Sequence, residues 1–304
     1  MAIPTTPLDV TRNVMFFESA TQGVLPTDPV MKNAGLQATI KKSSKKSISK
    51  IDIIGSPDPY SFMQMGNSAT FDLTYKMLDT VLPRYGTELE GGTGTIEKAI
   101  NFVLSRKING TEMFRIFQDC ITDSISIKYG EFYEVTQTFY CSVVSAYMTL
   151  AAFKTALGIS GTPQYAPALT GNPWSNLNST PGTPITINGT NTYNLEGLTV
   201  NYNRNVIVQR PMSNINPIYL RAGHRNITGT LEVDLDNTTL DSIYEAFTNS
   251  TIVYRVFTGS PNVDHTLNGV RFSENNDTID AGGNDISKIT LPFEVSTGTL
   301  GAYP

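Results

Sequence analysis

The sequence predicts a mainly β protein made of two copies of one domain, each with antiparallel strands and one short helix. Residues 70–75 (TFDLTY) and 230–235 (TLEVDL) both alternate apolar and polar side chains, as a half-buried strand does. A second alternating pair, residues 135–142 and 289–296, repeats at nearly the same offset along the chain. This near-constant offset indicates a duplication; chance alternation in two β-rich stretches is the alternative.

The composition is compatible with two globular domains. The chain has 304 residues, of which 39% are hydrophobic and 16% charged, and its net charge is −5. Chains of this length commonly form two domains of about 150 residues. A general nucleic-acid binder would carry a basic surplus, whereas an acidic surface repels DNA. We read no signal peptide at the start, and the apolar run Val143–Leu157 is too short and too polar to span a membrane.

Proline and glycine divide the chain into four expected segments. Four prolines predict an extended N-terminal arm over residues 1–36. Residues 158–191 are dense in Gly, Pro, Ser and Asn, and are too long for an ordinary connection within one domain. We therefore expect residues 37–157 to form the first domain, residues 158–191 a linker, and residues 192–304 the second domain.

A hairpin is expected in the first half, with strands at residues 114–128 and 132–144 joined by a turn at Tyr129–Glu131. Cys120 and Cys141 lie at nearly equal distances from this turn and should face each other. They can form a pair or remain reduced core thiols, and a protein made in the cytoplasm favours the thiols.

Three other segments are candidate helices. Residues 96–104 fit a strand or a helix equally well, whereas residues 146–157 contain good helix formers. In the second half, Thr238 with Asp241 resembles a capping box that opens a short helix over Leu240–Phe247.

The sequence shows no catalytic, cofactor or metal site, so we expect a protein that is not an enzyme. His224 and His265 have no second histidine at metal-ligand spacing and are interpreted as turn residues. The glycine-rich Gly91–Thr95 lacks the Lys-Ser/Thr of a phosphate loop. Asp234 begins a stretch that mimics a calcium loop, but Thr239 stands where that loop needs glycine.

The only run of like charges lies within residues 41–50 and contains Lys41, Lys42, Lys45 and Lys46. Three interpretations are open: a phosphate contact, a solvated loop, or a loop that reaches an acidic surface on a neighbouring copy. The acidic balance of the chain favours the last two.

Acidic side chains share one face of the strand near residue 234. Glu232, Asp234 and Asp236 alternate with apolar residues, and the corresponding strand of the first copy offers Asp72 and Thr74. The apolar set must face the core, because burying unpaired carboxylates is costly. The acids then line either a solvated sheet face or a negatively charged cavity.

Four segments together resemble bacteriophage tail tube proteins. Glu18–Pro26 (ESATQGVLP) resembles the opening of that family, where a Glu…Thr-x-Gly-x-x-Pro stretch precedes the first strand. Residues 223–236, 240–247 and 286–296 resemble its turn and alternating strand, its single helix and its closing strand. The long linker and the proline-rich arm depart from the commonest pattern.

The resemblance implies tandem β-sandwich or half-barrel domains, each flanked by a helix, in a structural virion protein. Such domains form rings that stack into the hollow tail tube, and two domains per chain imply a trimeric, pseudo-hexameric ring. Implied partners are the chain itself, tape-measure and tail terminator proteins, and DNA that passes without sticking. The implied location is the virion tail, assembled in the host cytoplasm. The acids would face the lumen and the lysines an adjacent ring; the alternative function is a β-sandwich receptor-binding or adhesin-like module.

Overall fold

The computed structural model describes residues 14–51, 61–78, 81–87, 99–130, 132–167, 185–191, 195–210, 216–217, 219–234, 245, 248–257, 263–273, 276–278 and 288–299. Most of the described residues lie in strands and few lie in helices, which confirms the prediction of a mainly β fold.

The elements follow one another along the chain as two groups. The first group contains β1 (Val14–Ser19), β2 (Lys32–Asn33), β3 (Leu36–Ile51), β4 (Ser61–Lys76), α1 (Val81–Thr87), β5 (Ala99–Ile108), β6 (Thr111–Tyr129), β7 (Glu134–Cys141), β8 (Val143–Val144), β9 (Met148–Thr149) and α2 (Leu150–Ala156). The second group contains β10 (Ile185–Ile187), β11 (Thr190–Asn191), β12 (Leu195–Asn203), β13 (Ile207–Gln209), β14 (Tyr219–Arg221), β15 (Asn226–Asp234), β16 (Ser250–Phe257), β17 (Val263–Phe272), β18 (Asn276–Thr278) and β19 (Lys288–Thr299).

The long strand β6 joins two sheets in the first half. Its residues 111–120 pair with β5, and β5 pairs with β1. Its residues 121–128 pair with β7, and the order continues through β4 to β3. Aromatic rings fill the space between the two sheets; these are Phe16, Phe71, Phe102, Phe117 and Phe139.

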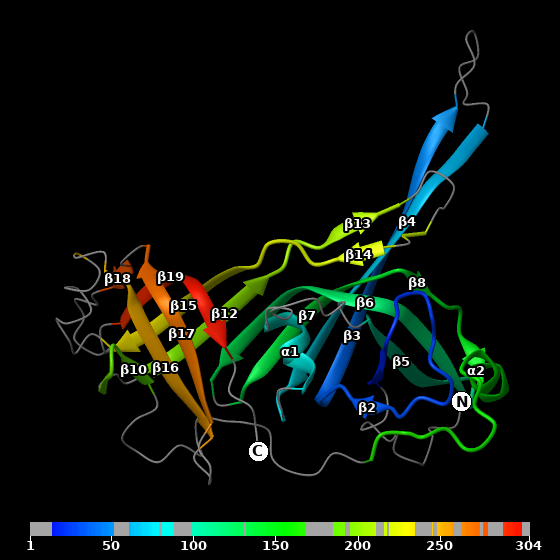
Figure 1. Ribbon diagram of the computed structural model, residues 1–304, viewed down its shortest axis with the longest axis horizontal. Helices are drawn as coiled ribbons and strands as arrows, with labels where there is room; N and C mark the ends of the chain where they lie inside the picture. The colour runs from blue at the N-terminus through cyan, green and yellow to red at the C-terminus, as the bar shows by residue number, and fades with distance from the viewer. Residues whose placement is uncertain are drawn as a thin grey trace.

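The sheet continues from the first half into the second (Figure 1). Strand β12 pairs antiparallel with β6, from Leu198 opposite Tyr129 to Asn203 opposite Ser124. Strands β15, β19, β17 and β16 follow in that order. A single buried core runs beneath both halves, so the two groups of strands form one packed body.

The same scheme of strand pairing occurs twice. In the first half β3 pairs with β4, β4 with β7, β7 with β6 and β6 with β5. In the second half β12 pairs with β15, β15 with β19, β19 with β17 and β17 with β16. The strand pairs that alternate in the sequence are therefore hydrogen-bonded neighbours in each half: β4 with β7, and β15 with β19.

A β-bulge also occurs at the same place in both halves. Asp119 of β6 and Gly269 of β17 both have a positive φ, of 49° and 62° respectively. One strand gains a residue at each site, which locally bends and twists the ladder. The flanking pairs are Ile100 with Cys120 and Phe102 with Phe117 in the first half, and Ser250 with Val270 and Ile252 with Leu267 in the second.

Two segment boundaries differ from the expected ones. Residues 14–19 of the extended arm predicted over residues 1–36 form β1, which is buried and pairs with β5 along its whole length. The flanking prolines had hidden this short apolar strand. The end of the expected linker, residues 185–191, forms β10 and β11, and β10 pairs with β16. Residues 1–13 and 168–184 lie outside the part that the structure describes.

The hairpin prediction is confirmed by the pairing of β6 with β7, in which Ile121 lies opposite Tyr140. Cys120 and Cys141 are buried free thiols. The ambiguous residues 96–104 contribute the strand β5 from residue 99 onward.

The helix predicted within residues 146–157 is α2, and Thr149 accepts a hydrogen bond from the Ala152 N–H at its start. Helix α1 was not predicted, because Pro83 and Gly86 disguise it. Gly86 lets α1 approach β6 closely: a Cβ there would lie 2.9 Å from the Ile125 side chain. Of the helix expected over residues 240–247 only Glu245 is described, and it is helical.

Candidate functional site

The described residues hold no group of three or more His, Cys, Asp or Glu that could bind a metal. In the same ranges, no helix is both long and apolar enough to cross a membrane. The calcium-like stretch begins with Asp234 inside strand β15, and the glycine-rich residues 91–95 lie outside the described ranges.

The interpretation of His265 as a turn residue is wrong. His265 lies in β17 and is fully buried, and its Nδ1 lies 3.2 Å from the Tyr254 hydroxyl. That hydroxyl is 2.8 Å from the hydroxyl of Tyr129, at the end of β6. Burial lowers the pKa of His265 to about 3, so the ring is neutral at neutral pH. This polar cluster ties β16 and β17 to the end of β6, beneath the point where the halves join.

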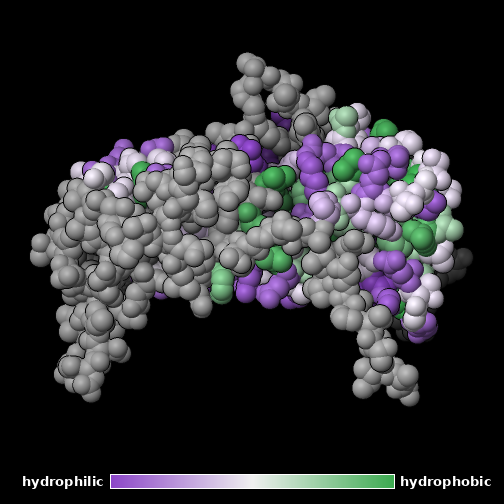
Figure 2. Space-filling model, turned by 90° about the horizontal axis from the view of Figure 1, so that it is seen from below, coloured by the Kyte–Doolittle hydropathy of each residue, from purple (hydrophilic) through white to green (hydrophobic). Residues whose placement is uncertain are grey.

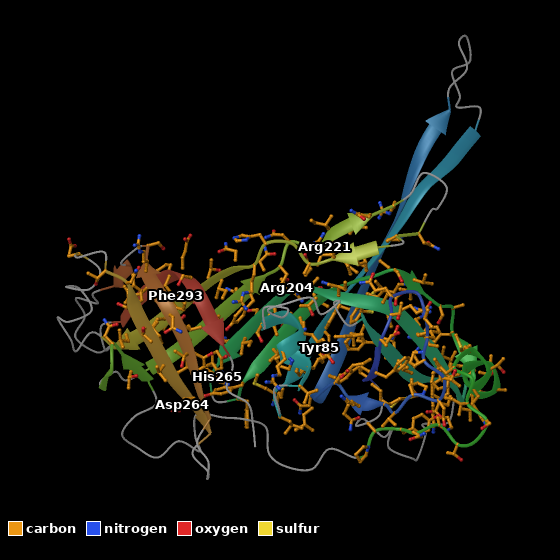
Figure 3. All side chains as sticks on the ribbon, in the orientation of Figure 1. Tyr85, Arg204, Arg221, Asp264, His265 and Phe293 are labelled. Carbon is orange, nitrogen blue, oxygen red and sulfur yellow. The ribbon has the colours of Figure 1, made fainter. Side chains whose placement is uncertain are left out.

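Side chains and backbone also lock the internal junction between β6 and β12. The Arg204 side chain, just beyond β12, donates from Nη1 to the Tyr85 carbonyl of α1, at 2.6 Å. Its backbone N–H donates to the Asp123 carbonyl, at 2.7 Å. Figure 3 places Arg204 and Tyr85 near each other in the middle of the molecule. Arg204 is only 5% exposed, and the Tyr85 carbonyl supplies a hydrogen-bond acceptor for its buried charge.

One face of the continuous sheet is polar along its whole width. Phe71 and Leu73 are buried, whereas Asp72 and Thr74, which alternate with them, are partly exposed. The Thr138 hydroxyl donates to Asp72 Oδ1, at 2.9 Å. This hydrogen bond between neighbouring strands holds the Asp72 side chain in place.

The second half presents the same face. Leu231 is buried and Glu232 is exposed, as the alternation of β15 predicts. A Cβ on Gly197 would lie 2.9 Å from Glu232 Oε2, so the missing side chain leaves room for this carboxylate. For Asp234 only the backbone position in β15 is described, and Asp236 lies outside the described residues.

Acidic residues lie opposite basic residues on neighbouring strands. The strand register places acids opposite bases instead of clustering the acids. Hydroxyl and amide side chains occupy most of the positions between them. The opposed pairs are Lys41 with Asp72, Lys76 with Glu134, Asp234 with Lys288, and Arg271 with Glu294.

A model of one protein family covers nearly the whole chain. It is described as phage tail tube protein, and it matches residues 11–295. The chain belongs to the phage tail tube protein family. A comparison with curated proteins finds no match. The resemblance seen in the sequence is thereby confirmed, and the family role is structural, in the virion tail.

Residues 18–26, which resemble the opening of the tail tube family, form a turn that is hydrogen-bonded to both halves of the chain. The Gly23 N–H donates to Asp119 Oδ1 at the β6 bulge, at 3.0 Å. The Gln22 side chain donates from Nε2 to the Leu220 carbonyl of β14, at 2.9 Å. The stretch that carried the family resemblance thus connects the first strand to the bulge and to the second half.

The lysine run lies in a strand of this tail tube protein, not in the loop that was expected. Lys41 and Lys42 are exposed on β3, and for Lys45 and Lys46 only the backbone is described. On its outer edge β3 pairs with no other described strand. Beyond the sandwich, β3 and β4 continue as a long projecting hairpin (Figure 1).

The lower face of the molecule gives no sign of a large apolar patch in its described part. Figure 2 shows hydrophilic and hydrophobic residues interspersed there. Contacts through such a face would depend on hydrogen bonds and charges more than on apolar area.

Sequence reasoning missed Asp119 and Arg204. Around Asp119 the run Ile116-Phe117-Gln118-Asp119 breaks the alternation of apolar and polar residues, and such a break is a sign of a bulge. Arg204 follows Tyr202-Asn203 at a strand end and carries no local signal of its role.

Proposed function

We propose that three copies of this chain close into a ring with six similar domains, and that the rings stack into a tail tube that conducts viral DNA. The observation that carries the proposal is the β6–β12 junction, which joins two sets of strands with the same pairing scheme into one sheet. The repeated scheme and the repeated bulge support a duplication, with tube domains at residues 37–157 and 192–304 and with β1 added to the first.

Ring closure would remove the free sheet edges of the single chain. Strand β3 forms one end of the continuous sheet, and β17 and β18 form part of the other. Unpaired edges recruit strands from other chains, and a closed ring satisfies all of them. A head-to-tail contact that closes after three chains gives a ring, whereas one that does not close gives a filament.

The polar face of the sheet would line the channel. Glu232, Asp72 and Thr74 lie on the face opposite the core, with Asp234 at the corresponding register position; Asp236 follows on the same strand. Three chains carry a net charge of −15, three times −5. Such a wall repels phosphates, and the register sets Lys41 and Lys76 opposite acidic residues, so DNA can pass without adhering.

The lysine run would contact a neighbouring subunit, in the same ring or the adjacent one. Lys41, Lys42, Lys45 and Lys46 lie on the strand that leads into the projecting hairpin. A basic strand on an acidic chain is complementary to the rest of its own surface. The tube ends would meet tape-measure and terminator proteins, and assembly would take place in the host cytoplasm.

Negative-stain microscopy of concentrated protein tests the proposal. Rings or tubes with a central channel are expected. Dispersed particles at all protein and salt concentrations would contradict it, and would favour the receptor-binding module.

A further inference from the structure

The internal junction shows how one domain joins the next, so it predicts the contact between chains. At the junction, Ile127 of β6 lies directly opposite Val200 of β12, and both are 0% exposed. In the pairing scheme of the first half, the edge strand β3 holds the place that β12 holds in the second half. In the second half, β18 holds the place of the end of β6. Among the described strands, β18 pairs only with β19.

The register gives the counterpart of each junction residue. The β6–β7 ladder contains Ile127 opposite Val135, and the matching ladder contains Asp277 opposite Ile289. The offset in residue number from Ile127 to Asp277 equals the offset between the two bulges, from Asp119 to Gly269. Asp277 therefore occupies the position of Ile127.

The counterpart of Val200 follows in the same way from β3. The ladder β12–β15 has a register shift just before Gly197 opposite Glu232, and β3–β4 has one just before Thr39 opposite Thr74. The offset from Thr39 to Gly197 equals the offset from Thr74 to Glu232. Applied to Val200, this common offset leads back to Lys42.

We propose that β18 of one chain pairs antiparallel with β3 of the next chain, with Asp277 directly opposite Lys42. The proposal rests on the ring proposed above and names the surfaces that close it. In place of the buried apolar pair of the internal junction, the contact between chains has an acid facing a base.

The surroundings of Lys42 favour an acidic partner. Lys42 lies opposite the buried Phe71, on the core side of the sheet edge. Partial burial of its ammonium, and then repulsion by Arg115, lower the pKa of Lys42. A lysine covered by a neighbouring strand at this position requires an acid beside it. The register places Asp277 opposite Lys42, so it supplies this acid.

The flanking sequences are complementary in charge. Residues 39–46 (TIKKSSKK) contain four lysines and no acid, whereas residues 273–280 (SENNDTID) contain three acids and no base. Opposite charges on facing strands stabilise pairing and exclude the alternatives of β3 with β3 or β18 with β18. The contact is thus head-to-tail.

The ends of the two hairpins follow the same correspondence. Ile207 opposite Arg221 in β13–β14 matches Ser49 opposite Met63 in β3–β4, at the same offset that relates Val200 to Lys42. Within the chain, β13–β14 reaches the first half, where Leu220 accepts a hydrogen bond from Gln22. The outer part of β3–β4 should accordingly reach the second half of the neighbouring chain.

Cysteine cross-linking tests the register. The double variant Lys42→Cys with Asp277→Cys, assembled and treated with a short thiol cross-linker, should give a covalent ladder on a non-reducing gel that ends at three chains. The native Cys120 and Cys141 are 0% and 1% exposed and stay unreactive. The matched control, Lys42→Cys with Asn276→Cys, places the second thiol on the opposite face of the sheet. It should cross-link at least tenfold less.

Charge-reversal variants test the same contact by a second measurement, the yield of assembled rings. Lys42→Asp or Asp277→Lys alone should lower the yield of assembled rings at least tenfold, and the double reversal should restore most of it. Tubes that form without the 42–277 cross-link, or a control that links equally well, would overturn this register and leave the tube intact. If the unmodified protein forms no rings, the proposed function itself fails.

Discussion

The two halves of the chain share their strand pairing but fill it with different side chains. In the first half, the Phe71 and Phe139 rings stack with their centroids 5.0 Å apart. At the matching place in the second half Gly229 lies opposite Phe293, and a Cβ on Gly229 would be 2.4 Å from the Phe293 ring. Where the first half has two aromatic rings in contact, the second half has a glycine and one ring. The ladders pair in the same way in both halves, whereas the packing between them differs.

The β-bulge that occurs in both halves also has the same backbone geometry with different side chains. In the first half, the Asp119 carboxylate at the bulge accepts hydrogen bonds from the Gly23 N–H and from the Ser142 hydroxyl. In the second half Gly269 stands there, and any side chain would collide with Ser296. The bulge of the first half therefore anchors the N-terminal turn, whereas the bulge of the second half has the backbone shape without a side chain.

Removing the ring that distinguishes the first half should have the largest effect. Phe71→Ala leaves a cavity among three other phenyl rings, and we expect the free energy of unfolding to fall by about 3–5 kcal/mol. Urea denaturation measures it. The adjacent Thr70→Ala, on the polar face, should change it by less than about 0.5 kcal/mol. Equal effects of the two variants would mean that the core does not depend on this ring.

Adding a methyl group at the matching place in the second half should cost less. Gly229→Ala places a Cβ against Phe293 and the Thr199 carbonyl, and we expect a loss of about 1–3 kcal/mol. The matched control is Gly130→Ala, where nothing lies within 4 Å. Combining Gly229→Ala with Phe293→Leu should recover part of the loss. A neutral Gly229→Ala variant would contradict the close contact between Gly229 and Phe293.

The pH dependence of stability distinguishes the halves by a smaller effect. His265 is buried in the second half, and its counterpart in the first is Arg115, whose guanidinium lies 3.9 Å from the Tyr147 ring centre. Because the pKa of His265 is lowered to about 3, folding favours its neutral form. The stability is therefore full above pH 6.5 and is lost as the pH falls towards 3, by about 1.4 kcal/mol per pH unit.

Urea denaturation at pH 7 and pH 5 measures this effect. Between these values the parent protein should lose about 2 kcal/mol more than His265→Asn does. The exposed His224→Asn should behave as the parent does. Parallel pH profiles for the parent and His265→Asn would contradict the assignment of a buried neutral ring.

Much of the fold was predictable where one side of a strand is buried. The alternation in residues 70–75 and 230–235, and the spacing about the turn at Tyr129–Glu131, gave the strands and the β6–β7 hairpin correctly. The ladders align Thr70 with Thr228 and not with Thr230, and a slip of two positions keeps every side chain on the same face. The repeated alternation predicts which side chains face the core, but it does not predict which residues pair across strands.

The remaining elements lacked that signal for physical reasons. Strand β1 is short and flanked by prolines, and α1 contains Pro83 and Gly86. The lysine run was read as a loop because an edge strand with polar residues on both faces has no apolar alternation. The facing of Glu232 was predictable from Leu231, since carboxylates cannot be buried alone. The match of Lys42 with Asp277 needed the register of two ladders, which no single segment contains.

The number of chains in one ring decides whether both halves of the chain build the channel wall. Cryo-electron microscopy of the assembled protein should show rings of three chains, in which six similar β domains alternate around the channel and Glu232 faces the lumen. Rings of six whole chains, with the second half outside the channel wall, would contradict the account.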